Sequence, residues 1–449
     1  DNRSSSDSSE RYRSSRACSA SINRQGVLRK SLVNPEGFSA TKINGMDLKG
    51  AIKKILRRVP LLFHIVYYVY RKVRKFMPPI TNGWFLCKMH ILIKDDPMKL
   101  KIYNEALADE EQRRLSPITR AMPTFMSMCM DTQCNLRCIM CPRQKYLQET
   151  LNARSYDFEV LKRVANEVFP YLRWVELTVV GEPLMARSFM DQLRIAEKYS
   201  VRVYLTTNAT LLNSDDLIKE ILRVVSCLHV SVDGATKETF ESIRIGAKFE
   251  EVIENIRGFN RLRKKLNAKD KCRLHFAVVL MKRNIKELPK LVELAKELGI
   301  DSVGCSHVII YEERMRDESL LYHKELANHY MELARRKADE LNVCLNLPPL
   351  FTGVDGVQGK RLKNNSRSEF KTCPFLWKRA YIEWNGDVST CCVSGHPVMG
   401  NVREKPFREI WNNELYQEMR RRLNTDSPFE CCKHCFMIAP DDDVAYLRI

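Results

Sequence analysis

Strand-like and helical segments alternate along the chain from about residue 122, and this alternation limits the possible folds more than any other feature. Short β-rich runs lie at 124–130, 174–180, 201–207, 228–233, 273–280 and 302–308. Segments with helical periodicity separate or follow them at 157–169, 187–198, 214–225, 249–266, 285–298 and 323–341. Successive β/α units favour a parallel sheet wound into a partial or whole barrel, with ligands at the carboxyl ends of its strands. We therefore predict an α/β fold with a partial (β/α)6 parallel barrel over residues 122–345.

Three cysteines follow the first expected strand on one short loop, as Cys134, Cys138 and Cys141. Their thiolates can hold three irons of a 4Fe-4S cube and leave the fourth iron without a protein ligand. A structural zinc site needs four protein ligands, and a ferredoxin cluster needs four cysteines. The triplet therefore favours a catalytic cluster whose open iron binds a substrate or cofactor.

Polar residues at the ends of three later strands complete a family pattern. Gly181-Glu182-Pro183 follows the second strand, Thr207-Asn208-Ala209 ends the third, and Ser231-Val232-Asp233-Gly234 ends the fourth. Together with the cysteine triplet they resemble the radical S-adenosylmethionine (SAM) superfamily, whose corresponding segments are G-E-P, T-N-G and S-x-D-G. The resemblance extends over residues 122 to about 310.

The resemblance implies a set of cofactor contacts. The cluster would be held by the catalytic Cys134, Cys138 and Cys141, and the G-E-P segment would bind the amino group of SAM. The residues expected to contact SAM are Met140, Gly181, Glu182, Pro183, Thr207, Asn208, Ser231, Asp233 and Arg244. Met140 stands where the family often has an aromatic residue, and Ala209 where it more often has glycine. Neither difference removes a ligand.

A second group of cysteines lies in the last hundred residues and includes Cys373, Cys391, Cys432 and Cys435. Asn385-Gly386 joins two β-rich runs between the first two of them, and Asn-Gly is the strongest short signal for a hairpin with a type I′ turn. The hairpin would bring the first two cysteines together. A helix expected over 411–423 would return the last two to the same place.

This arrangement resembles the auxiliary-cluster domain of radical SAM enzymes, called SPASM in its long form and twitch in its short form. The long form has further cysteines after its C-x2-C pair, and none follows Cys435 in this sequence. The resemblance therefore implies one auxiliary 4Fe-4S cluster with four ligands, Cys373, Cys391, Cys432 and Cys435. The adjacent Cys392 and Cys431 leave this register open by one residue. A zinc ion on four thiolates is the alternative.

The positive charge of the chain is concentrated at its N-terminal end. Residues 1–90 hold 18 Lys and Arg against 5 Asp and Glu, a surplus of 13 within the formal net charge of +19. Residues 1–45 are rich in Ser and Arg without periodicity, so we predict a disordered tail. Within a basic amphipathic extension over 46–121, residues 48–77 place an apolar stretch between basic flanks. The apolar stretch, 12 residues at 59–70, is too short to span a bilayer but suits an anionic membrane surface. Packing on the enzyme core and contact with nucleic acid are the alternatives.

The family resemblance implies the chemistry of a radical SAM oxidoreductase. Such an enzyme takes an electron from a reduced flavodoxin or ferredoxin-type donor, cleaves SAM to a 5′-deoxyadenosyl radical and removes hydrogen from a substrate carbon. An auxiliary cluster that accepts the substrate's electron would make the net reaction a dehydrogenation. A short auxiliary domain favours a sugar, cyclitol or lipid-linked small substrate, and a peptide is the alternative. Nucleic-acid modification and a non-catalytic iron–sulfur protein are alternatives of other classes.

The expected parts of the chain are thus the tail at 1–45, the extension at 46–121, the barrel at 122–345 and the auxiliary-cluster domain at 346–449. The polar N-terminus resembles no secretory signal peptide, and the clustered cysteines favour metal sites over disulfides. We therefore expect a cytoplasmic location, with association at the cytoplasmic face of a membrane if the basic segment binds lipid. We expect His307 to be structural, whereas Arg143 suits either a substrate contact or an exposed position.

Overall fold

The computed structural model describes residues 96–129, 131–144, 157–177, 180–351, 373–391, 396–423 and 425–433. The chain divides into two compact units, Asp1–Met77 and Pro78–Ile449, and every described residue belongs to the second. The expected tail at 1–45 and the basic segment at 48–77 lie outside the described residues. Among the helices that the structure describes, none combines the length and the apolar character that a bilayer-spanning segment needs.

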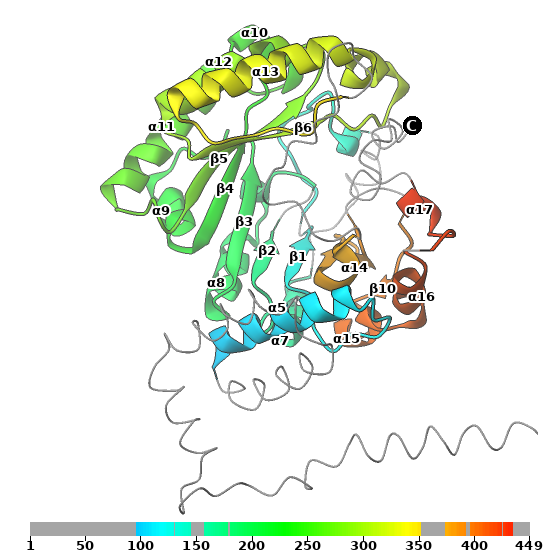
Figure 1. Cartoon of the computed structure of the whole chain (residues 1–449). Coiled ribbons are helices and arrows are strands. Elements are labelled where there is room, and N and C mark those ends of the chain that lie inside the picture. The colour runs from blue at the N-terminus through cyan, green and yellow to red at the C-terminus, as the bar shows by residue number, and fades with distance from the viewer. Residues whose placement is uncertain are drawn as a thin grey trace, which may run out of the picture. The chain divides into compact units, whose positions relative to one another are not determined.

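The described strands form one open sheet in the order β10-β9-β8-β1-β2-β3-β4-β5-β6-β7 (Figure 1). Their bounds are β1 Phe125–Met128, β2 Trp174–Glu176, β3 Arg202–Thr207, β4 Val225–Ser231, β5 Arg273–Leu280, β6 Ser302–His307, β7 Leu345–Asn346, β8 Arg379–Ile382, β9 Asp387–Ser389 and β10 Gly400–Asn401. Neighbouring strands from β1 to β7 pair in parallel. The sheet does not close on itself, so the predicted partial parallel barrel is confirmed.

Helices cover the outer face of these strands (Figure 1). They are α7 Phe158–Val168, α8 Phe189–Lys198, α9 Asp215–Val224, α10 Lys237–Ile243, α11 Phe249–Lys265, α12 Leu288–Leu298 and α13 Lys324–Leu341. On β5 the alternate residues Leu274, Phe276 and Val278 are buried, whereas the residues between them are only half-buried. Because successive side chains of a strand point to opposite faces, this pattern places the apolar core under the helices and leaves the inner face accessible.

The C-terminal region extends the barrel sheet. A short helix, α14 (Phe375–Lys378), leads into β8, and β8 and β9 form the predicted antiparallel hairpin. β8 also pairs in parallel with β1, with Phe125 opposite Arg379. No sequence pattern predicts this pairing, because it joins strands that are more than 250 residues apart. The short helices α15 (Phe407–Trp411), α16 (Glu414–Arg422) and α17 (Glu430–Lys433) follow.

The turn of the hairpin differs from the prediction. Gly386 has φ +90°, but Asn385 is not among the described residues with positive φ, so the type I′ turn is wrong. The Gly386 N–H donates to the Glu383 carbonyl at 2.9 Å, and the Glu383 N–H donates to the Asp387 carbonyl at 2.8 Å. This is the next most common hairpin connection, in which a turn is followed by a glycine in the left-handed region.

The helix predicted over 411–423 is confirmed as α16, which spans Glu414–Arg422, but its predicted start is three residues too early. α15 ends at Trp411, and α16 begins after Asn413. The Asn413 side chain accepts a hydrogen bond from the Tyr416 N–H at 2.9 Å, so it serves as an N-cap. Two successive asparagines at 412 and 413 favour such a cap over a continuous helix.

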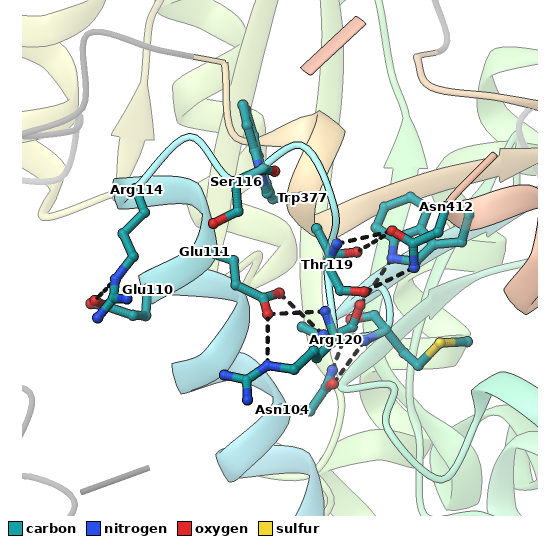
Figure 2. A network of polar contacts seen from close by, with 12 residues as sticks. Asn104, Glu110, Glu111, Arg114, Ser116, Thr119, Arg120, Trp377 and Asn412 are labelled. Carbon is teal, nitrogen blue, oxygen red and sulfur yellow. Dashed lines mark hydrogen bonds and ion pairs between the residues drawn. The ribbon is translucent and has the colours of Figure 1, made fainter. Parts of the chain in front are cut away.

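A polar network joins the barrel to the C-terminal region (Figure 2). It begins in α5 (Pro97–Arg113) and the segment that follows this helix. The Asn412 side chain accepts from the Thr119 N–H at 2.9 Å and donates to the Thr119 carbonyl at 2.8 Å. Nε1 of Trp377 donates to the Ser116 carbonyl at 2.8 Å. The segment before the first strand is therefore hydrogen-bonded to the C-terminal region.

Candidate active site and auxiliary metal centre

A cavity of about 300 Å³ lies at the carboxyl ends of the parallel strands. Its wall brings together most of the residues that the sequence assigned to the cluster and to SAM. These are Cys134, Cys138, Met140, Cys141, Gly181, Glu182, Thr207, Asn208, Ser231 and Arg244. Pro183 and Asp233 are buried and are not among the residues that line the cavity. The rule that parallel strands end at one edge thus accounts for the convergence.

Backbone contacts hold the cysteine loop from two sides. The Ile139 N–H donates to the carbonyl of Ile243, the last residue of α10, at 3.0 Å. On the other side Gly181 has φ +96°, and a Cβ there would lie 2.8 Å from the backbone oxygens of Asp131 and Gln133. Only glycine can approach the loop so closely in this conformation. The glycine of the G-E-P segment therefore has a packing role beside the cysteines.

The three thiols are buried next to a guanidinium group. Burial raises the pKa of Cys134, Cys138 and Cys141, that of Cys138 to about 11. Nη1 of Arg244 lies 3.7 Å from Sγ of Cys138. Nε of Arg244 is buried and has no hydrogen-bond partner among the described residues. Metal binding displaces thiol protons, and a cluster with thiolates brings negative charge to the unsatisfied guanidinium. The donor set therefore fits a 4Fe-4S cluster.

Glu182 joins the ends of two strands. Its carboxylate accepts from Oγ1 of Thr207 at 2.6 Å and from the Asn208 N–H at 2.8 Å, and it is 2% exposed. Burial raises its pKa, although these hydrogen bonds oppose the shift. The carboxylate also accepts from the Leu184 N–H at 3.3 Å, and because it has about four lone-pair sites, capacity remains for one more donor from the cavity.

Asp233 contacts the cavity only through another residue. It is completely buried, and its Oδ1 accepts from the Val279 N–H at 2.7 Å. Its Oδ2 forms an ion pair with Nη2 of Arg244 at 2.6 Å. The following residue must be glycine, because a Cβ at Gly234 would lie 2.5 Å from the Phe240 nitrogen. Asp233 therefore orients the arginine that faces the cysteines.

The cavity wall also includes residues that the sequence did not assign to the cluster or to SAM, among them Arg143, which is buried and not exposed, and His307, which was expected to be structural. They are Leu136, Pro142, Arg143, Thr206, Val279, Ser306, His307, Val308, Ile309 and Tyr311. Burial lowers the pKa of His307 to about 4, so the imidazole is neutral near pH 7. Nε of Arg143 donates to the Thr132 carbonyl at 2.7 Å, which holds this side chain against the wall. The signal for His307 was its position at the end of the sixth strand, the edge where the other site residues lie.

A stack of rings lies below the cavity on the inner face of the sheet. The ring centroids of Tyr204 and His229 are 4.2 Å apart, and those of His229 and His275 are 4.6 Å apart. Burial lowers the pKa of His229 to about 3 and also lowers that of His275. Both imidazoles are therefore neutral near pH 7 and do not repel a cationic sulfonium in the cavity above.

The second group of cysteines is only partly described. Cys373 precedes α14 and Cys391 follows β9, and both are half-buried, whereas Cys432 is buried in α17. Cys435 and Cys392 lie outside the described residues. Sγ of Cys431 is 4.0 Å from Sγ of Cys432, and a ring nitrogen of His396 joins them within 4.8 Å. His396 is a residue that no metal-ligand spacing in the sequence points to.

Models of known protein families match the barrel and the C-terminal region of the chain. A model of the radical SAM superfamily matches residues 132–295, and a model of the SPASM iron–sulfur cluster-binding domain matches residues 373–436. A tungsten-containing aldehyde ferredoxin oxidoreductase cofactor-modifying protein of Pyrococcus furiosus is 25% identical over 66% of this chain and 83% of its own length. An AdoMet-dependent heme synthase of Methanosarcina barkeri is 26% identical over 66% of this chain and 85% of its own.

Solved structures share the fold. SuiB of Streptococcus suis, bound to S-adenosylmethionine, is 18% identical, with a TM-score of 0.53 over 76% of this chain and 74% of its own. The domain matches imply a 4Fe-4S cluster with SAM in the barrel and auxiliary iron–sulfur clusters in the C-terminal domain. With the cysteine triplet on the cavity wall and the hairpin joined to β1, the chain is a member of the radical SAM superfamily that carries a C-terminal SPASM domain.

Proposed function

We propose that this enzyme cleaves SAM reductively and removes a hydrogen atom from a carbon of a small substrate, with net oxidation of that substrate. The observation that carries the proposal is the cavity in which the three thiols meet the polar strand ends. When bound, the cluster and SAM supply the 5′-deoxyadenosyl radical that removes the hydrogen. The side chains of this protein bind the cluster and SAM, position the substrate and exclude water.

In this proposal the catalytic residues Cys134, Cys138 and Cys141 hold three irons and keep the fourth open. The cavity-wall residues expected from the family contact SAM, with Glu182 as acceptor for its amino group. Its buried carboxylate retains capacity for one more donor. Arg244 offers its buried Nε to an anionic partner, and Asp233 is its positioning residue. Pro183, which is buried, supports the glutamate.

The other side of the cavity is suited to a substrate. His307 remains neutral near pH 7, so it can share the cavity with a sulfonium cation without repulsion. Val308 and Ile309 add apolar surface, which helps to exclude water from a reactive intermediate. We assign this wall, formed by residues 306–309 and by Tyr311, to substrate positioning.

We assign electron acceptance to the C-terminal domain. One auxiliary 4Fe-4S cluster on Cys373, Cys391, Cys432 and Cys435 would take the electron left on the substrate, and a reduced flavodoxin or ferredoxin would supply the barrel cluster. The small-molecule proposal is supported by relatives named as a heme synthase and a cofactor-modifying protein. Sugar, cyclitol and lipid-linked substrates remain in this class. A peptide is the alternative, since one solved neighbour binds a precursor peptide, but that likeness concerns the fold alone.

The test is SAM cleavage by anaerobically reconstituted protein with dithionite, measured as 5′-deoxyadenosine. We expect cleavage by the unmodified chain and none by the variant with Cys134→Ala, Cys138→Ala and Cys141→Ala. Cys344→Ala is the matched control, because this cysteine is exposed and does not line the cavity. Cleavage that survives the triple substitution would exclude the proposed site. If cleavage depends on the three cysteines, deuterium transfer from labelled small molecules to 5′-deoxyadenosine would identify the substrate.

We also propose that residues 48–77 bind an anionic membrane surface. The basic flanks of an apolar stretch support this, since each Lys or Arg near anionic lipid contributes about 1 kcal/mol. Deletion of residues 1–77 should release the protein from anionic liposomes in a flotation assay and leave SAM cleavage unchanged. Equal flotation of the shortened and full-length chains would contradict the membrane proposal.

A further inference from the structure

Three metal-binding donors from separate segments meet in the C-terminal domain. A ring nitrogen of His396 and the sulfurs of Cys431 and Cys432 all lie within 4.8 Å of one another. The two sulfurs are 4.0 Å apart. His396 follows the hairpin, whereas the two cysteines lie in α17, so the fold and not the local sequence brings them together.

The sheet fixes the position of the histidine. The Met399 N–H donates to the Val388 carbonyl at 2.8 Å, and Gly400 pairs with Val388 on β9. The chain that leads away from His396 is therefore held against the same hairpin that ends at Cys391. This pairing keeps His396 near the end of the hairpin that carries Cys391.

A buried hydroxyl orients the imidazole. Nδ1 of His396 lies 2.7 Å from Oγ1 of Thr390, a residue with no exposed surface. Histidines that bind metals usually hydrogen-bond a neighbouring polar group through their other ring nitrogen, which fixes the tautomer and the ring orientation. With Nδ1 directed at Thr390, Nε2 is the nitrogen that faces the sulfurs of α17, where the imidazole hydrogen-bonds Cys431 and where a metal would bind. Thr390 also immediately precedes Cys391, so the orienting residue and an expected ligand are neighbours.

We propose that His396 is an iron ligand of the auxiliary iron–sulfur cluster, through Nε2, beside the thiolate of Cys432. This inference rests on the auxiliary cluster assigned above and goes beyond its all-cysteine ligand set. Cys373, Cys391, Cys432 and His396 make four donors among the described residues. The histidine then takes the position that the sequence pattern gives to the last cysteine of the region.

The ligand change has an electronic consequence. An imidazole is neutral where a cysteinate is anionic, and histidine ligation raises the reduction potential of iron–sulfur centres. A higher potential makes the auxiliary cluster a better acceptor for an electron from the substrate. Mixed ligation therefore suits the oxidation proposed for this enzyme.

The test uses the full-length chain with Cys134→Ala, Cys138→Ala and Cys141→Ala, so that only the auxiliary centre contributes a signal. The protein is grown with ¹⁵N-histidine, reduced, and examined by electron–nuclear double resonance. We expect a ¹⁵N hyperfine coupling that His396→Ala abolishes and that His329→Ala, a substitution on α13, retains. Absence of coupling in the parent protein overturns the inference without requiring any His396 variant to fold.

Redox titration and metal analysis give two further tests. His396→Cys should lower the equilibrium constant for reduction by tenfold or more, a fall of about 59 mV for a one-electron couple. An unchanged potential would contradict ligation. Cys435→Ala should retain the iron and the ¹⁵N coupling, and loss of both would return the fourth position to cysteine. Zinc in place of iron in the parent protein would overturn the auxiliary-cluster assignment itself, which distinguishes that failure from the failure of histidine ligation.

Discussion

The two candidate metal sites differ in how the chain assembles them. The barrel site takes three thiols from one loop, Cys134 to Cys141, and completes its wall with the ends of parallel strands. The donors of the C-terminal site come from separate segments. Cys373 precedes α14, Cys391 and His396 follow β9, and Cys432 lies in α17. A site on one loop is visible in residue spacing. A site assembled from distant segments depends on sheet pairing, which spacing does not encode.

The largest expected effect separates the two sites by their chemistry. Cys432→Ala should leave uncoupled SAM cleavage within about twofold of the unmodified chain, because the barrel cluster and its cavity contain no residue of α17. Turnover of a substrate should stop, because its electron has no acceptor. Both quantities are measured in one reaction, as 5′-deoxyadenosine and as product. Turnover that continues in Cys432→Ala would make the C-terminal centre structural.

The next effect concerns the ion pair behind the cavity. Asp233→Ala should destabilise the fold by about 3–5 kcal/mol, because it leaves Arg244 buried without its partner. Asp233→Asn should cost less, since the amide oxygen can still accept from the Val279 N–H. Urea unfolding measures both. A loss below about 1 kcal/mol in Asp233→Ala would mean that the arginine finds another partner.

A smaller effect concerns the hydrogen bonds between the two regions. Asn412→Ala removes three hydrogen bonds to Thr119, two with its backbone and one with its hydroxyl, and should cost about 1–3 kcal/mol. Asn346→Ala is the matched control, because that asparagine is exposed on the edge strand β7. Equal stability of the two variants in urea would show that the network in Figure 2 does not hold the regions together.

The last effect is a pH dependence of stability caused by His229, which is small near pH 7 and grows as the pH falls. The pKa of His229 is about 3 in the folded chain and about 6.5 when unfolded, so between these values only the unfolded chain binds the proton. Stability should fall with falling pH by up to about 1.4 kcal/mol per pH unit from this residue. His229→Phe keeps the ring stack and should remove this part of the slope. Thermal unfolding between pH 4 and 7 measures it, and an unchanged slope would contradict the buried neutral imidazole.

The sequence predicted the parts whose physical causes are local. Hydrophobic periodicity gave the strand and helix order, and strand ends gave the cavity wall, because all parallel strands end at one edge. The turn at Asn385-Gly386 was mispredicted because the tight two-residue loop is only the commonest of several glycine-containing hairpins. The pairing of β8 with β1 and the approach of His396 to α17 depend on long-range packing, for which no sequence period exists. The boundaries near residues 45, 121 and 345 stay predictions.

Iron and sulfide content of the anaerobically reconstituted chain tests the two-site account most directly. A chain with two clusters should hold about eight irons and eight sulfides, four of each per cluster, and about four of each after Cys134→Ala, Cys138→Ala and Cys141→Ala. About four irons in the unmodified chain, or none after the triple substitution, would contradict it, because the C-terminal region would then hold no iron–sulfur cluster of its own.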